Sequence, residues 1–332
     1  MKYFLILSFS TTLLGPVLAE PPGDAVSPLQ IEHGNLSLLL RDNAESPKVL
    51  SGIDSLVNVH DAPGYDAFDP DSEGASAGLN FEHIISGHAS PANKFAPRNG
   101  RYTLYRRGDG TSAELVREAR DDPWALASTF KYTAHAPAAI DFEFQCRAQK
   151  PELFGPRGYA VLFFAHYMND VAEVPIHFRG VAGPGEPEIW ISADAPPGHP
   201  DFNKGGTYRS LPAADLAYDA AHDFKLNLWS YDYPRFTQPF YFGRAAHGMV
   251  FILMFDRMYG PDDEIRFSLF KFKLPRHPRP AWDFQYVIHR VTADRTYGFK
   301  GRLIWKKFVS ADDCLAEYQR WKNSLPDARL GG

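Results

Sequence analysis

The chain has 332 residues and a formal net charge of −5 at neutral pH. A chain with this charge has no basic field that could hold a polyanion, so nucleic acid is excluded as an expected partner. Aromatic residues make up 14% of the sequence, a content typical of β-sheets and of surfaces that stack against sugars.

The first 19 residues have the pattern of a secretory signal peptide. Lys2 supplies a positive charge, residues 3–14 are too short an apolar run to span a bilayer, and small residues before Glu20 form a cleavage site. No cysteine follows the apolar run, so a lipid anchor is not expected. We therefore expect a secreted or periplasmic protein without a membrane span, in which residues 20–332 form a single β-sandwich domain with a C-terminal helix.

Apolar and polar residues alternate with a period of two along most of the chain, which predicts antiparallel strands. In chain order these strands are residues 34–40, 101–107, 125–135, 140–147, 174–179, 224–233, 265–273, 282–291 and 298–306. Residues 159–165 and 249–255 are continuously apolar, as in strands that are covered on both faces. The expected fold class is all-β, a large antiparallel β-sandwich.

One helix is predicted, over residues 311–325. Ser310 and Asp313 have the spacing of an N-cap pair. Apolar residues recur at helical spacing after them, at Cys314, Leu315, Tyr318, Trp321 and Leu325. We expect this helix to dock on the sandwich through those residues.

Cys146 and Cys314 are the only cysteines. An exported protein could join them in a disulfide, and two separately buried thiols are the alternative. No HxH, HExxH or CxxC spacing occurs, so no metal site is expected. No cofactor is expected either, because the sequence has no P-loop motif and no GxGxxG dinucleotide-binding motif.

Several segments resemble the large β-sandwich of galactose-mutarotase-like proteins: ELVR at 114–117, Trp124, FKY at 130–132 and IDFEF at 140–144. The resemblance covers residues 30–306 in the general pattern of strands and aromatic residues. It implies a mutarotase-like supersandwich and a carbohydrate-active protein, since aldose epimerases, many polysaccharide lyases and some glycoside hydrolases share this fold. The His-Gly-Gly segment of the epimerases is missing, so the resemblance implies no epimerase activity and identifies no catalytic residue by matching.

The apolar segment 159–165 ends in a polar cluster. His166, Tyr167, Asn169 and Asp170 follow it directly, and polar groups at the end of a buried strand are held rigidly near solvent. His166 is a candidate base, Tyr167 a candidate acid, and Asn169 or Asp170 an orienting partner. The alternative is a strand end whose polar groups satisfy a turn.

Glu82 and His83 place a carboxylate beside an imidazole in the sequence. In a regular strand, neighbours point to opposite faces, so at most one of the two would face a given cleft. Glu82 is a candidate catalytic carboxylate, and a hydrogen-bonded residue on a sheet face is the alternative.

Candidate substrate-binding residues come from three places. As a strand, residues 224–233 would align Lys225, Asn227, Trp229, Tyr231 and Tyr233 on one face, where aromatic rings flanked by an amide can bind a sugar. The same row could instead pack beneath the second sheet. Arg235 could pair with a ligand carboxylate, and His247 and His289 lie near strand ends.

These features predict a secreted carbohydrate-active enzyme, a polysaccharide lyase or a glycoside hydrolase, acting on a polysaccharide or oligosaccharide. A lyase would use a His or Tyr to remove the proton next to a uronate carboxylate, while Asn, Arg or His neutralises the developing charge. A hydrolase would use two carboxyl groups, with Glu82, Asp170, Glu173 and Asp232 available.

The alternative is a non-catalytic secreted carbohydrate-binding or structural protein. An enzyme cleft should combine an acid–base pair of perturbed pKa with its aromatic residues, whereas a binding face would lack that pair.

Overall fold

The computed structural model describes residues 23–44, 50–68, 77–87, 93–195, 204–218, 230–272, 279–293 and 295–326. The predicted signal peptide lies outside these residues, and so do Asn227 and Trp229. No helix in the described ranges is long and apolar enough to cross a membrane.

Strands make up most of the described chain, and their bounds follow. The N-terminal strands are β1 (Leu29–His33), β2 (Leu36–Arg41), β3 (Gly52–Asn58) and β4 (Asn80–Ser86). The middle of the chain forms β5 (Thr103–Arg107), β6 (Ser112–Arg117), β7 (Leu126–His135), β8 (Ala139–Ala148), β9 (Ala160–Ala165), β10 (Val171–Val181), β11 (Ile189–Ala193) and β12 (Lys204–Tyr208). The last strands are β13 (Arg235–Phe236), β14 (Phe240–Ala245), β15 (Met249–Phe255), β16 (Asp263–Phe272), β17 (Arg279–Ile288) and β18 (Thr296–Lys307). The α-helices are α1 (Ala96–Asn99) and α2 (Ala311–Ser324).

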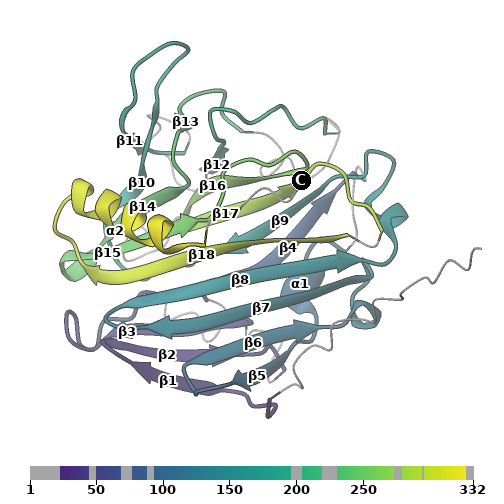
Figure 1. The fold of residues 1–332 in the computed structure, drawn as a ribbon, viewed down its shortest axis with the longest axis horizontal. Helices are drawn as coiled ribbons and strands as arrows, with labels where there is room; N and C mark the ends of the chain where they lie inside the picture. Colours follow the sequence, from purple (N-terminus) through teal and green to yellow (C-terminus); the bar gives the residue numbers. More distant parts are fainter. Residues whose placement is uncertain are drawn as a thin grey trace, which may run out of the picture.

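These strands form three antiparallel sheets (Figure 1). The largest has the order β11-β10-β14-β15-β18-β8-β7-β6-β5, with β13 paired to β10. A five-stranded sheet has the order β12-β16-β17-β9-β4, and a three-stranded sheet the order β1-β2-β3. The predicted all-β fold class and the C-terminal helix are confirmed.

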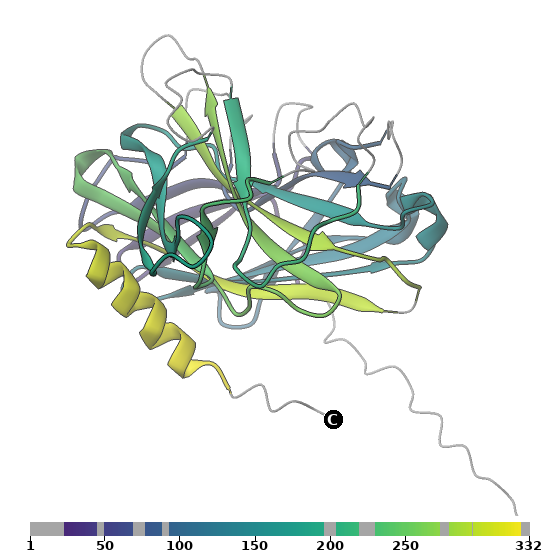
Figure 2. The same ribbon diagram turned by 90° about the horizontal axis from the view of Figure 1, so that it is seen from above.

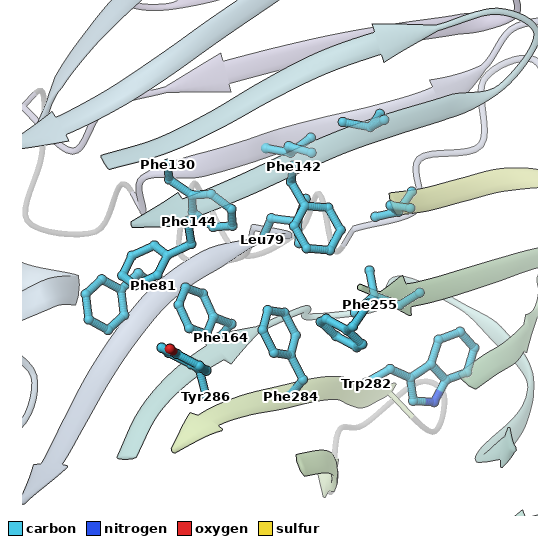
Figure 3. Close-up of a cluster of buried hydrophobic side chains, with 14 of the residues drawn as sticks. Leu79, Phe81, Phe130, Phe142, Phe144, Phe164, Phe255, Trp282, Phe284 and Tyr286 are labelled. Carbon is cyan, nitrogen blue, oxygen red and sulfur yellow. The ribbon is translucent and has the colours of Figure 1, made fainter. Parts of the chain in front are cut away.

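Aromatic side chains fill the space between the largest sheet and the five-stranded sheet (Figure 3). Phe144 of β8 meets Phe164 of β9 edge-on at 4.9 Å, and Phe164 stacks on Phe284 of β17 at 4.7 Å. Such pairs stabilise a core by about 0.5–1.5 kcal/mol beyond the area that they bury. Because Phe164 points into this core, its neighbour Phe163 points to the opposite face of the five-stranded sheet.

The two continuously apolar segments form central strands, β9 and β15, in which every residue is buried. In β15, Phe251 faces the core between the sheets, whereas Ile252 faces the cluster beneath α2. The prediction that these strands are covered on both faces is confirmed.

Helix α2 packs on the outer face of the largest sheet (Figure 2). The Ser310 hydroxyl accepts a hydrogen bond from the backbone N–H of Asp313 at 3.1 Å, which caps the helix. Tyr318 stacks on Phe240 of β14 at 4.8 Å. Cys314 is buried under the helix and Cys146 in the core on the other side of the sheet, and both thiols are free.

The predicted strand 224–233 is not found in its described part. Residues 230–234 form a loop that leads into the short strand β13, and residues 219–229 lie outside the described ranges. The alternating face expected for Tyr231 and Tyr233 is therefore wrong, since side-chain alternation requires a regular strand.

Candidate active site

A pocket of about 350 Å³ lies on the face of the five-stranded sheet that points away from the core. This volume is within the range of small-molecule sites. Its aromatic lining consists of Phe95, Phe163, Tyr167, Phe270 and Phe272. Such rings can stack on the C–H faces of a sugar, and polar groups from three strands and α1 complete the lining.

A β-bulge in β4 brings Glu82 and His83 into this pocket together. Phe81 pairs with Phe164 and His83 with Phe163, so Glu82 is the extra residue between the two pairs. Both side chains line the pocket, and the His83 ring stacks on Phe163 at 4.4 Å. The expectation that only one of the two residues faces a given cleft is therefore wrong, because it assumed a regular strand.

Three side chains hold the Glu82 carboxylate. The Tyr167 hydroxyl and Arg98 Nη1 donate to Oε1, the latter at 2.8 Å, and His83 Nδ1 lies 3.3 Å from Oε2. Burial acts to raise the pKa of Glu82, but hydrogen bonds from His83 and Tyr167 and the charge of Arg98 outweigh it, so the pKa is lowered. Glu82 is therefore ionised at neutral pH.

Asp283 of β17, the second carboxyl group of the pocket, has the opposite shift. Its side chain is almost fully buried, and its Oδ1 accepts one hydrogen bond, from the backbone N–H of His166 at 2.8 Å. Burial raises the pKa of Asp283 well above its usual range, and the charge of Glu82 raises it further. One pocket thus combines a carboxyl group whose pKa is lowered with one whose pKa is raised.

The side chain of His166 lies in the core instead of the pocket. Its ring lies 5.3 Å from Phe251 and 5.7 Å from Phe284. Neither ring nitrogen has a hydrogen-bond partner within the described ranges, and burial lowers the pKa of His166 to about 3. The predicted position of His166 as a base in the cleft is corrected: His166 follows Phe164 by two residues and shares its core-facing side, while Tyr167 faces the pocket.

Three other predicted residues lie away from the pocket. The backbone oxygen of Asp170 accepts the Tyr65 hydroxyl, and His247, in the turn between β14 and β15, contacts the Tyr65 ring at 4.7 Å. Arg235 donates to three backbone oxygens of nearby loops and lies 5.4 Å from the Tyr233 ring. Its guanidinium therefore stabilises the backbone of the loops that contain Leu211, Ala213 and Asp232.

Two more predicted residues border the pocket's sheet. The ring of Tyr231 packs directly on the backbone of Gly206, a residue of β12 that lines the pocket. The contact is so close that a Cβ atom added to Gly206 would lie 2.5 Å from this ring. His289 follows β17, and its Nε2 lies 3.5 Å from Glu264 Oε1. Of the other acids expected for hydrolysis, Glu173 pairs with His177 and Asp232 with Arg209.

Sequence reasoning missed Asp283 and Arg98 as site residues. Asp283 had a detectable signal, a charge within the apolar segment 281–288, whereas Arg98 lies in a single helical turn with no distinctive pattern. Across the described ranges, no group of three or more His, Cys, Asp or Glu side chains is placed to hold a metal ion.

Comparison with known proteins gives distant structural similarity alone. No family model matches the chain, and no curated protein matches it. The chain is similar to a protein assigned as an aldose 1-epimerase from Escherichia coli K12, at 12% identity and a TM-score of 0.42, over 85% of this chain and 99% of that one. It is also similar to a GalM/aldose epimerase homologue from C. elegans, at 10% identity and a TM-score of 0.39, over 85% of this chain and 99% of that one.

A heparan sulfate lyase, HepC from Pedobacter heparinus, is similar at 7% identity and a TM-score of 0.41, over 83% of this chain and 34% of that one. The chain thus spans about a third of the lyase. At these identities and TM-scores, the three similarities assign no activity to this chain.

Proposed function

We propose that this chain is a carbohydrate-active enzyme that hydrolyses glycosidic bonds of a polysaccharide or oligosaccharide in the pocket of Glu82 and Asp283. The observation that carries the proposal is the pair of carboxyl groups with opposite pKa shifts in one aromatic-lined pocket. Glycoside hydrolases use such a pair, one group as acid and the other as carboxylate. A purely sugar-binding face needs no such pair.

Each carboxyl group has one role in this mechanism. Asp283 uses Oδ1 to accept the His166 N–H, which leaves Oδ2 to carry the proton that is given to the glycosidic oxygen. Glu82 remains ionised and stabilises the positive charge on the sugar ring, as nucleophile or as base for a water molecule. Arg98 and Tyr167 keep Glu82 in its charged form.

A lyase reaction is the second candidate, favoured by the presence of Arg98 and His83 in the same pocket. His83 would remove the proton next to a uronate carboxylate, and Arg98 would neutralise the developing charge. Tyr167 is a poor base, since burial and the charge of Glu82 raise its pKa well above the usual range. The signal-like residues 1–19 support a proposed location outside the cytoplasm for either reaction.

The test uses a panel of neutral and uronate-containing polysaccharides. Reducing ends and the ultraviolet absorbance of unsaturated products are measured separately: hydrolysis yields reducing ends alone, and a lyase yields both. Glu82→Gln and Asp283→Asn should each lower kcat by roughly a hundredfold to ten-thousandfold, because each removes a group that acts in the transition state. Asp170→Asn, outside the pocket, is the control and should keep wild-type activity. Full activity in folded Asp283→Asn would contradict the assignment.

A further inference from the structure

The pocket of Glu82 and Asp283 has two aromatic walls, one on each side of Asp283. The wall on the β4 side consists of Phe95, His83 and Phe163, and the wall on the β16 side consists of Phe270 and Phe272. In the sheet order β16-β17-β9-β4, strand β17 with Asp283 lies between the strands of the two walls. A ligand that fills the pocket therefore contacts a different set of rings on each side of this carboxyl group.

The β16 wall is the exposed part of an otherwise buried strand. Every residue of β16 is buried except Phe270 and Phe272, whose rings lie 4.7 Å apart. The Phe270 ring packs directly on Gly205 of β12, where an added Cβ atom would lie 2.6 Å from it, so the ring has a fixed support. Aromatic surface that stays partly exposed inside a pocket is typical of a surface that a ligand covers.

Each wall lies next to one of the two carboxyl groups. On the β4 wall, His83 stacks on Phe163 at 4.4 Å, and its Nδ1 lies 3.3 Å from the carboxylate of Glu82. On the other side, Asp283 pairs with Ser268 of β16, and Phe270 follows Ser268 by two residues. Residues two apart on a strand share a face, so Phe270 is a diagonal neighbour of Asp283 on the pocket face.

These positions orient the bond that is cleaved in the proposed hydrolysis. The carboxylate acts at the anomeric carbon, and the acid gives its proton to the glycosidic oxygen. The bond from this carbon to this oxygen therefore points from Glu82 toward Asp283. Because β9 separates β4 from β17, the two backbones are about 10 Å apart across the sheet, which leaves room for the bond between them. The leaving group, on the side of the acid, then extends toward β16.

We propose that Phe270 and Phe272 bind the leaving group of the substrate, and that the β4 wall binds the sugar ring whose anomeric carbon is attacked. The proposal rests on the proposed function and specifies its substrate: the leaving group presents a flat apolar face, as a second sugar ring or an aryl group does. The bond to the leaving-group oxygen breaks, and this oxygen takes the proton of Asp283. Water then supplies the hydroxyl group on the anomeric carbon and returns a proton to one of the two carboxyl groups.

The test compares leaving groups of different shape on one sugar, the sugar that wild type releases from the polysaccharide panel. The probes are its glycosyl fluoride, whose leaving group has no ring, its phenyl glycoside and its disaccharide. Phe270→Ala should lower kcat/KM about tenfold on the phenyl glycoside and the disaccharide, the effect of one lost ring contact. Its loss on the fluoride should stay below about twofold.

Phe95→Ala, on the β4 wall, is the matched control. It removes a ring from the side that holds the sugar itself, so it should lower kcat/KM by the same factor on the fluoride and on the phenyl glycoside. Phe270→Tyr keeps the ring and should keep the wild-type preference between the probes. If the melting curve shows that Phe270→Ala does not fold, Phe270→Leu replaces it with the same expectation, since leucine keeps an apolar side chain without a flat face.

Failure of this assignment and failure of the proposed function give different results. Equal loss on the fluoride and the phenyl glycoside in the Phe270 variant, or no loss on either, would overturn the leaving-group site while hydrolysis by wild type stands. No turnover by wild type, or elimination products in place of hydrolysis, would contradict the proposed function and this assignment with it.

Discussion

Glu82 and Asp283 have opposite pKa shifts in one pocket because their surroundings differ. Glu82 is surrounded by the Tyr167 hydroxyl, the Arg98 guanidinium and the His83 ring, and the bulge in β4 brings Glu82 and His83 into the same pocket. Asp283 accepts one hydrogen bond, from a backbone N–H, and is buried near the negative charge of Glu82. Burial penalises the charge of both groups, so the nearby donors and charges decide the direction in which each pKa shifts.

The raised pKa of Asp283 makes the stability of the protein depend on pH in a defined direction. An unfolded aspartate titrates near 3.9, whereas folded Asp283 keeps its proton to higher pH. Between these two pKa values the folded state binds more protons than the unfolded state, so the free energy of unfolding falls as pH rises. Wild type should therefore lose stability relative to Asp283→Asn as pH rises above about 4. Urea unfolding of both proteins over a pH series measures this, and a pH-independent difference would contradict the assignment.

The sequence predicts a strand well in two cases. Either one face of the strand is apolar and the other polar, or both faces are buried and the whole strand is apolar. Strand β8 alternates along its whole length, and β9 and β15 are apolar throughout. Where the pattern misled, a local feature broke the regular geometry: the extra residue at Glu82 in β4, and the loop at residues 230–234. A period-two pattern shows where side chains would alternate, and it does not show a bulge.

Helix α2 should contribute strongly to the stability of the whole sandwich. Trp321 is buried against the outer face of the largest sheet, and Leu315 packs on the same cluster. Truncating a buried Trp costs about 3–5 kcal/mol, so Trp321→Ala with Leu315→Ala should lower the melting temperature by roughly 10 °C or more. Lys322→Ala, an exposed neighbour on the same helix, is the control and should melt like wild type. An unchanged melting curve for the double variant would mean that α2 is detached in solution.

At the scale of the molecule, the site depends on strand pairings that a single sequence does not reveal. The pocket joins Glu82 of β4, Arg98 of α1, Tyr167 after β9 and Asp283 of β17, and the sheet order β17-β9-β4 brings them together. Tyr167 was recognisable because it directly follows an apolar strand. Asp283 had only the signal of a charge within an apolar segment, and the sequence does not show its bond to His166, which joins positions 117 residues apart.

Export is the remaining prediction for the whole molecule. Cys146 and Cys314 are free and lie on opposite sides of the largest sheet, so the fold gives no disulfide evidence for an oxidising compartment, and the proposal rests on residues 1–19 alone. Expressed in a Gram-negative host, the protein should be recovered from the periplasm with Glu20 as its first residue. Leu7→Arg places a charge in the apolar run and should keep the full-length chain in the cytoplasm, while Lys2→Arg retains the charge and should be exported like wild type. Fractionation and N-terminal sequencing measure both, and intact wild-type chain in the cytoplasm would contradict the prediction.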